Sequence, residues 1–186
     1  MLTWKPNWAS AAVHRFVDGA GGPGRVVSKM LGSASMVEPD GRKVAFTRAV
    51  DAADLADLRG IEVTAHLFQV AVSKAHDARL VVIGDRQFGF AIYANSDDSR
   101  LDFRRDYDSL RYDTIEVPTH VAESVWLLMQ RMGLAYAAID FVVTPDGDWV
   151  FIGDLNPGGQ YGWLESHTGI GLTDALADLL ARGMAS

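Results

Sequence analysis

Three oxygen-bearing side chains lie on two strand-like segments that a tight turn connects. Asp140 lies within the apolar segment 138–143, and Asp154 and Asn156 lie near the end of the segment 149–157. The turn between the two segments contains the residues Pro-Asp-Gly and ends at Gly147. Side chains alternate between the two faces of a strand, so Asp154 and Asn156 share a face. If the turn centres near Gly147, Asp140 lies opposite or almost opposite Asp154 on the same face.

This arrangement predicts chemistry that uses a cation. Two carboxylates facing each other on an otherwise apolar strand pair destabilise it unless a cation or a proton compensates their charge. Hard divalent ions with oxygen ligands suit such a site, and Mg²⁺ does so above all when phosphates complete its octahedron. Carboxylates at strand ends are also common as solvated groups, and the spacing alone leaves both interpretations open.

The elements that must position these groups predict an α+β protein with mostly antiparallel pairing. Apolar residues at helical spacing predict a helix over 8–17, followed by the glycine-rich segment 18–24. Further helices are expected over 51–58, 118–132 and 173–181, and a long polar loop over 95–113. β-Rich runs between polar turns predict strands over 25–29, 43–47, 66–73, 79–83, 88–93, 136–143 and 149–155, with 43–47 as the partner of 25–29.

Composition and charge argue against several classes of function, including nucleic-acid binding, binding to anionic membranes and cysteine chemistry. The chain has 186 residues, of which 48% are hydrophobic, and 24 acidic against 17 Lys and Arg residues give a net charge of −7. So acidic a chain is a poor general binder of nucleic acid or of anionic membranes, because the phosphate term would be repulsive. The absence of cysteine excludes disulfides and thiolate chemistry. No apolar run approaches the length of a membrane helix, and we expect a soluble, cytoplasmic protein.

The order of several motifs resembles the catalytic part of the ATP-grasp superfamily, and within it the ribosomal-peptide maturases that make graspetides. The motifs are a strand-borne lysine, then FQ-x-x-V-x-K, D-x-R-L-V-V-I-G, an Ile-Asp-Phe strand, and a D-x-N-P strand followed by GQ-x-x-W-L-E. The resemblance implies an ATP-grasp fold in which two α+β subdomains hold a nucleotide between them. It further implies an N-terminal helix and linker over 1–24, a small subdomain over 25–65 and a large subdomain with the metal-binding hairpin over 66–186.

The resemblance also implies roles for individual residues. Arg79 matches an arginine at the γ-phosphate or acyl phosphate, and Arg104 resembles a contact to substrate or phosphate, so both are candidate catalytic residues. Asp140, Asp154 and Asn156 match the Mg²⁺ ligands. The residues expected to bind ATP are Lys29, Ser33, Gln69, Lys74, Arg79 and Asn156.

The implied activity is an ATP- and Mg²⁺-dependent ligation through an acyl phosphate, with a ribosomal precursor peptide as substrate. Two departures from the family pattern keep an alternative open. The family usually has glutamate at the position of Asp154, and its enzymes carry a further N-terminal domain that forms one wall of the substrate cleft. We therefore expect either an enzyme whose missing wall comes from a homo-oligomer or partner, or a non-catalytic pseudo-ligase that binds peptide or nucleotide.

Overall fold

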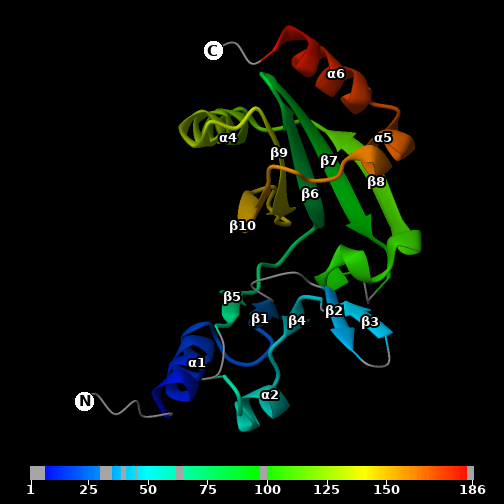
Figure 1. Cartoon of the computed structure of the whole chain (residues 1–186). Coiled ribbons are helices and arrows are strands. Elements are labelled where there is room, and N and C mark those ends of the chain that lie inside the picture. Colours follow the sequence, from blue (N-terminus) through cyan, green and yellow to red (C-terminus); the bar gives the residue numbers. More distant parts are fainter. Residues whose placement is uncertain are drawn as a thin grey trace. The chain divides into compact units, whose positions relative to one another are not determined.

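The structure is a computed structural model that describes residues 7–29, 35–38, 41–44, 46–61, 65–96 and 100–183. The chain divides into two compact units, each with its own hydrophobic core (Figure 1). Unit 1 comprises Met1–Val72 and Asp97–Arg105, and unit 2 comprises Ser73–Ser96 and Asp106–Ser186. The chain therefore passes between the units three times. The predicted boundaries after residues 24 and 65 stay a prediction.

Unit 1 packs a helix against a small antiparallel sheet. The helix α1 (Asn7–Gly19) presents Val13 and Val17 to Val26 and Val50. The sheet has the order β4-β1-β5, and its strands are β1 (Val26–Lys29), β4 (Arg48–Ala49) and β5 (Leu67–Val70). Unit 1 also contains the hairpin β2 (Ser35–Glu38) and β3 (Gly41–Val44), the helix α2 (Ala52–Ala56) and the 3-10 turn η1 (Phe103–Arg105).

The predicted partner of the first strand is wrong. The segment 43–47 does not pair with β1, because residues Gly41–Val44 instead close a hairpin with Ser35–Glu38. The strand β1 pairs with Arg48–Ala49 on one side and with Leu67–Val70 on the other. Pairing with β5 joins segments about forty residues apart, and local sequence patterns carry no information about such long-range contacts.

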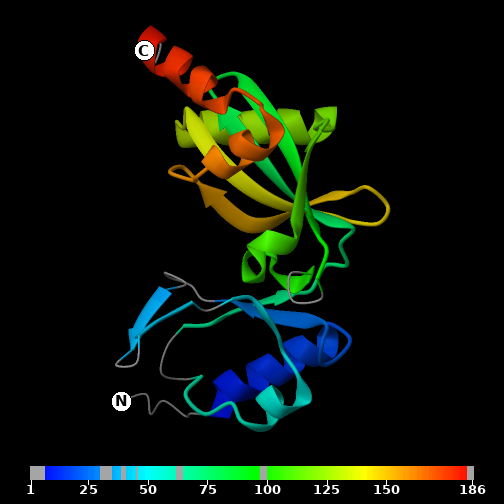
Figure 2. The same cartoon turned by 90° about the vertical axis from the view of Figure 1, so that its right-hand side faces the viewer.

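Unit 2 is built on a five-stranded antiparallel sheet with the order β10-β9-β6-β7-β8. The strand pairs β6–β7 and β9–β10 are hairpins, and β9 pairs with β6 to join the two hairpins into one sheet (Figure 2). The strands are β6 (His76–Ile83), β7 (Arg86–Ala94), β8 (Leu110–Ile115), β9 (Tyr136–Val143) and β10 (Trp149–Asn156). The helical elements are η2 (Tyr107–Ser109), α4 (Thr119–Met132), α5 (Gly162–Thr168) and α6 (Leu172–Arg182).

Helices cover both faces of this sheet (Figure 1). The helix α4 covers one face, where Val121, Val125 and Met129 pack on Leu80 and Ile139. Helices α5 and α6 pack on the other face, against a cluster that includes Val81, Ile83 and Phe90. Strand alternation places Arg79 on this second face with Val81 and Ile83, and Asp140 with its cross-strand partner Arg79. The candidate site thus lies beside the α5 and α6 core.

The α+β class and the antiparallel pairing are confirmed. The helix predicted over 118–132 is confirmed as α4, which ends at Gly133 in a left-handed conformation (φ 62°) that glycine adopts without strain. The loop predicted over 95–113 is wrong for residues 110–113, because they form the first part of β8. The short helix α5 is not predicted. Within the described residues, no helix is long and apolar enough to cross a membrane.

Candidate active site

A row of three charged residues runs across three neighbouring strands of unit 2. Arg79 of β6 is the direct cross-strand partner of Asp140 on β9, and Asp140 is the direct partner of Asp154 on β10. The predicted opposition of Asp140 and Asp154 is therefore confirmed. Cβ atoms of direct partners lie about 4.5–5.5 Å apart, so the two carboxylates repel each other unless a positive charge is near. Arg79 supplies that charge from the next strand.

An irregularity in the β9–β10 pairing shapes this row. Phe151 pairs with Phe141, but the next pair along the ladder is Asp154 with Asp140, so the register shifts between Phe151 and Asp154. Gly153 within the shift has φ 83°, a conformation that side-chain-bearing residues rarely adopt. Bulges re-aim side chains, and this one brings Asp154 into line with Asp140.

The guanidinium of Arg79 is held on three sides. Its Nε and Nη2 donate to Oδ1 and Oδ2 of Asp140 at 2.7 and 2.8 Å, its Nη1 donates to the carbonyl oxygen of Gln160 at 3.3 Å, and it lies 5.4 Å from the ring centroid of Trp163. The Arg79 side chain is 16% exposed and that of Asp140 is 12% exposed. Burial opposes the charge on Arg79, but hydrogen bonding and the charge of Asp140, with smaller contributions from Asp154 and Tyr107, raise its pKa above the ordinary value. Arg79 is thus a firmly charged and oriented cation.

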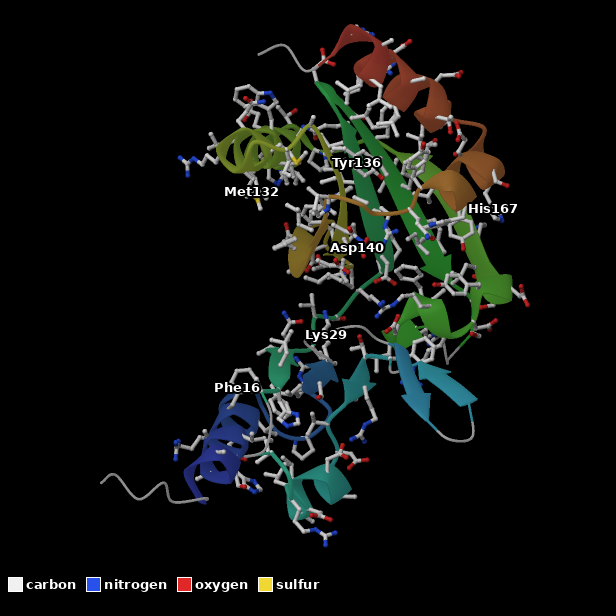
Figure 3. All side chains as sticks on the ribbon, viewed as in Figure 1. Phe16, Lys29, Met132, Tyr136, Asp140 and His167 are labelled. Atoms are coloured by element: carbon white, nitrogen blue, oxygen red, sulfur yellow. The ribbon has the colours of Figure 1, made fainter. Side chains whose placement is uncertain are left out.

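The loop after β10 supports Arg79 by packing closely on β9. A Cβ atom on Gly159 would lie 2.5 Å from Cβ of Ala138, so only glycine allows this approach. The carbonyl of Gly159 accepts a hydrogen bond from the hydroxyl of Tyr136, which lies on β9 with Asp140 (Figure 3). Close packing at Gly159 sets the position of the next residue, Gln160, whose carbonyl accepts from Arg79.

Lys74 lies just before β6 and pairs with Asp77. Its Nζ approaches both carboxylate oxygens of Asp77, at 2.7 and 2.5 Å, and the two side chains are 16% and 7% exposed. Asp77 lies two residues before Arg79 on β6 and therefore on the same face. The structure thus brings Lys74 and Arg79 to one region of unit 2, each matched with an aspartate.

Arg104 belongs to unit 1 and is held by Asp102. Arg104 donates through Nε and Nη2 to the carboxylate of Asp102 at 2.8 and 2.7 Å, and Asp102 also accepts from the backbone N–H of Thr47 at 2.9 Å. The Asp102 side chain is 4% exposed, whereas Arg104 is 42% exposed. Burial alone would raise the pKa of Asp102, but these donors outweigh it and lower the pKa to about 2. Asp102 is therefore a buried carboxylate that holds Arg104 and the backbone of Thr47.

Lys29 and Gln69 lie on adjacent strands of unit 1. Lys29 ends β1 opposite Leu67, and Gln69 lies in the middle of β5 opposite Val27 (Figure 3 labels Lys29). Because Gln69 and Leu67 share one face of β5, their partners Lys29 and Val27 share a face of β1. Ser33 lies outside the described residues.

The donor set of the hairpin fits a hard divalent cation in its chemistry. It consists of two carboxylates and one amide oxygen. No group of three His, Asp or Glu side chains that could hold a metal ion occurs in the described ranges, at the hairpin or away from it. Asp154 and Asn156 are exposed at the end of β10. Asn156 Oδ1 accepts from the N–H of Gly158 at 2.9 Å, which orients the amide. Oxygen donors of this kind are those that Mg²⁺ prefers.

Sequence reasoning missed Trp163 and Tyr136 as parts of this site. Trp163 contacts Arg79, and its ring also lies 5.0 Å from that of Tyr112, which anchors α5 to β8. The tryptophan that follows the D-x-N-P motif could have been recognised as a candidate, because an arginine buried beside carboxylates commonly stacks on an aromatic ring. The pairing of Arg79 with Asp140 needs the β6–β9 register, which no local pattern supplies.

Comparison with known proteins gives matches among solved structures. No known family's sequence profile and no curated protein sequence matches the chain. The macrocyclase MdnC of Microcystis aeruginosa MRC, solved with the precursor peptide MdnA, is 27% identical with a TM-score of 0.78. The ATP-grasp ligase associated with a ribosomal peptide in Chryseobacterium gregarium, solved with ADP and a leader and core peptide, is 26% identical with a TM-score of 0.84. The chain has an ATP-grasp fold.

The ATP-grasp fold extends over 93% of the chain in both comparisons and resembles that of graspetide maturases. The chain spans about half the length of these structures, 52% of each. A more distant match, D-cycloserine synthetase DcsG, is 14% identical with a TM-score of 0.64, and the match covers 94% of this chain and 60% of that one. At that identity the likeness concerns the fold alone.

Proposed function

We propose that this chain is the ATP- and Mg²⁺-binding part of a ligase that activates a carboxylate as an acyl phosphate and joins it to an amine or hydroxyl. The observation that carries the proposal is the row Arg79–Asp140–Asp154 across three neighbouring strands of an ATP-grasp sheet. A fixed arginine beside two carboxylates is suited to phosphoryl transfer, which depends on positioning and charge neutralisation more than on covalent help from the protein.

In this proposal a substrate carboxylate oxygen attacks the γ-phosphorus of ATP, and the bond to the β-phosphate oxygen breaks to release ADP. The amine or hydroxyl then attacks the acyl carbon, loses its proton and displaces phosphate. Arg79 orients and neutralises the transferred phosphate, because its planar fork suits bidentate contact with an anion. In unit 2, Lys74 is proposed to supply positive charge for the nucleotide phosphates. In unit 1, Lys29, Ser33 and Gln69 are proposed nucleotide-binding residues, and Arg104 is proposed to contact substrate or phosphate.

Asp140, Asp154 and Asn156 would hold Mg²⁺, with Asn156 also close to the nucleotide. When bound, the ion neutralises charge on the phosphate oxygens. Asp154 is one methylene shorter than the glutamate usual in the resembling family, and the bulge at Gly153 offers a way for the backbone to bring it into reach.

The proposed substrate is a ribosomal precursor peptide that is crosslinked or cyclised in the cytoplasm. Support comes from two solved neighbours, one bound to a precursor peptide and the other to a leader and core peptide. In this proposal a homo-oligomer or partner subunit also contributes to the peptide site.

Incubation of the chain with ATP, Mg²⁺ and the precursor peptide encoded beside it tests the proposal. We expect ADP release and a product lighter by one water per crosslink in mass spectrometry. Asp140→Asn should abolish the product, and Arg111→Gln, which removes a charge from the exposed edge strand β8, serves as the matched control. If no phosphate is released with any peptide encoded by a neighbouring gene, ligase activity is refuted.

A non-catalytic pseudo-ligase is the second candidate. The bidentate ion pair in which Arg79 donates to both oxygens of Asp140 favours this candidate, because it neutralises one carboxylate without a metal. Calorimetry with a non-hydrolysable ATP analogue and Mg²⁺ separates the candidates. Binding that Asp140→Asn and Lys29→Ala both weaken, together with ADP release in the incubation above, supports the ligase. Binding without ADP release, or no binding by the unaltered chain, supports the pseudo-ligase.

A further inference from the structure

The row formed by Arg79, Asp140 and Asp154 already contains a cation, the guanidinium of Arg79. Asp140 and Asp154 together carry two negative charges, and Arg79 in the same row reduces the sum to one. The side chain of Asp140 is 12% exposed, and each of its oxygens accepts a hydrogen bond from the same guanidinium. A divalent cation that approaches Asp140 therefore meets a carboxylate whose charge is already compensated.

The residues around Arg79 hold its guanidinium in place beside Asp140. The Gln160 carbonyl accepts from Nη1, and the Trp163 ring lies beside the guanidinium. The loop carrying Gln160 is itself fixed by the close contact of Gly159 with Ala138. Charge-assisted bidentate pairs are about twice as strong as neutral hydrogen bonds, and a partly buried aromatic contact strengthens the hold on the cation.

We propose that Arg79 is the resident counter-ion of the Asp140–Asp154 pair and that a divalent cation competes with its guanidinium for Asp140. Arg79 then acts as a positioning residue that lowers cation affinity in the absence of nucleotide. A phosphate anion offers the guanidinium another partner, so nucleotide and cation binding become cooperative. This inference rests on the proposed metal site, and it assigns to Arg79 a role before any phosphate is present.

Titration of the whole chain with Mn²⁺ in the absence of nucleotide tests the competition, with the paramagnetic resonance signal of unbound Mn²⁺ as the readout. Arg79→Gln should bind Mn²⁺ about tenfold more tightly than the unaltered chain, because a unit charge a few ångströms from the ion is removed. Arg79→Lys keeps the charge but loses the planar fork, so its affinity should lie between the two. Arg111→Gln, on the edge strand β8, should leave the affinity unchanged.

A second variant, which leaves the charge of Arg79 in place, keeps the test decisive if Arg79→Gln does not fold. Trp163→Phe loosens the hold on the guanidinium without altering net charge, and it should raise Mn²⁺ affinity about twofold. Equal or weaker Mn²⁺ binding by the folded variants of Arg79, or by Trp163→Phe if those do not fold, would overturn the competition.

Asp140→Asn separates this inference from the proposed function. If Asp140→Asn weakens Mn²⁺ binding while Arg79→Gln leaves it unchanged, the metal site stands and the competition is refuted. If Asp140→Asn has no effect, or if neither the unaltered chain nor Arg79→Gln binds Mn²⁺, the metal site and the competition are both refuted.

Discussion

Arg79 and Asp140 are direct partners across strands β6 and β9, joined by two hydrogen bonds of 2.7 and 2.8 Å although they lie 61 positions apart in the sequence. The pair links the stability of the sheet to the chemistry proposed for it. Removing either partner leaves the other as a largely buried charge, which costs more than the pair itself contributes.

A double-mutant cycle measures this relationship. Arg79→Gln and Asp140→Asn should each lower the free energy of unfolding by about 2 kcal/mol, and the double variant should lose less than the sum of the two. Urea denaturation monitored by circular dichroism gives the three values.

The ion pair Arg111–Asp113 is the control for that cycle, because both side chains are about half exposed on the edge strand β8. Its coupling energy should be below about 0.5 kcal/mol, as for exposed pairs in general. Equal coupling energies for the two pairs would contradict the structural distinction drawn between them.

Asp102 should make stability depend on pH at the acidic end. Its pKa falls from 3.8 to about 2 on folding, so it stabilises the folded chain fully above the unfolded pKa and loses this contribution as pH falls from about 4 to 2. Asp102→Asn should therefore lower the free energy of unfolding by about 2 kcal/mol at pH 7 and by much less at pH 2. Denaturation of both proteins across this range tests it, and a pH-independent difference would contradict it.

Gly159→Ala should destabilise unit 2 by about 1–3 kcal/mol, because its new Cβ atom would lie 2.5 Å from Ala138 and 3.2 Å from the carbonyl of Asn156. Gly158→Ala is the matched control, since the nearest atom to its Cβ lies at an ordinary 3.8 Å. Thermal denaturation compares the two variants. Adding Ala138→Gly should restore part of the loss, and no restoration would argue against this contact as the cause.

Trp163→Leu should lower the free energy of unfolding by about 2 kcal/mol, because it removes ring contacts with Tyr112 and with Arg79. Trp163→Phe keeps an aromatic ring and should lose about half as much. Urea denaturation of the two variants provides the measurement, and equal losses would show that apolar volume alone matters at this position.

The sequence was most informative where local geometry decides the structure. The apolar alternation and the turn ending at Gly147 were enough to predict the hairpin itself. The register next to the turn would place Ile152 opposite Asp140, and the shift between Phe151 and Asp154 places Asp154 there instead. The bulge that contains Gly153 was not predicted, because a single glycine in a strand does not reveal where the register shifts. The roles of individual site residues remain predictions, since they depend on ligands.

Prediction failed where distant segments meet. The true partners of β1 and the capture of Arg79 by Asp140 arise from pairings that no local period encodes. Strand β8 carries Arg111 and Asp113 on an edge of the sheet, where charged residues are tolerated, and so it resembled a loop. The burial of Asp102 could not be predicted, because it accepts from the backbone of Thr47, 55 positions away.

The segment Asp97–Arg105 belongs to unit 1 although the chain on both sides of it belongs to unit 2. Unit 1 is therefore not encoded by one uninterrupted stretch of the gene. A coding fragment that stops at Val72 leaves out Asp102, the residue that accepts from the backbone of Thr47. Recombination that exchanges either unit intact must consequently cut the coding sequence at more than one point, which favours inheritance of the two units together.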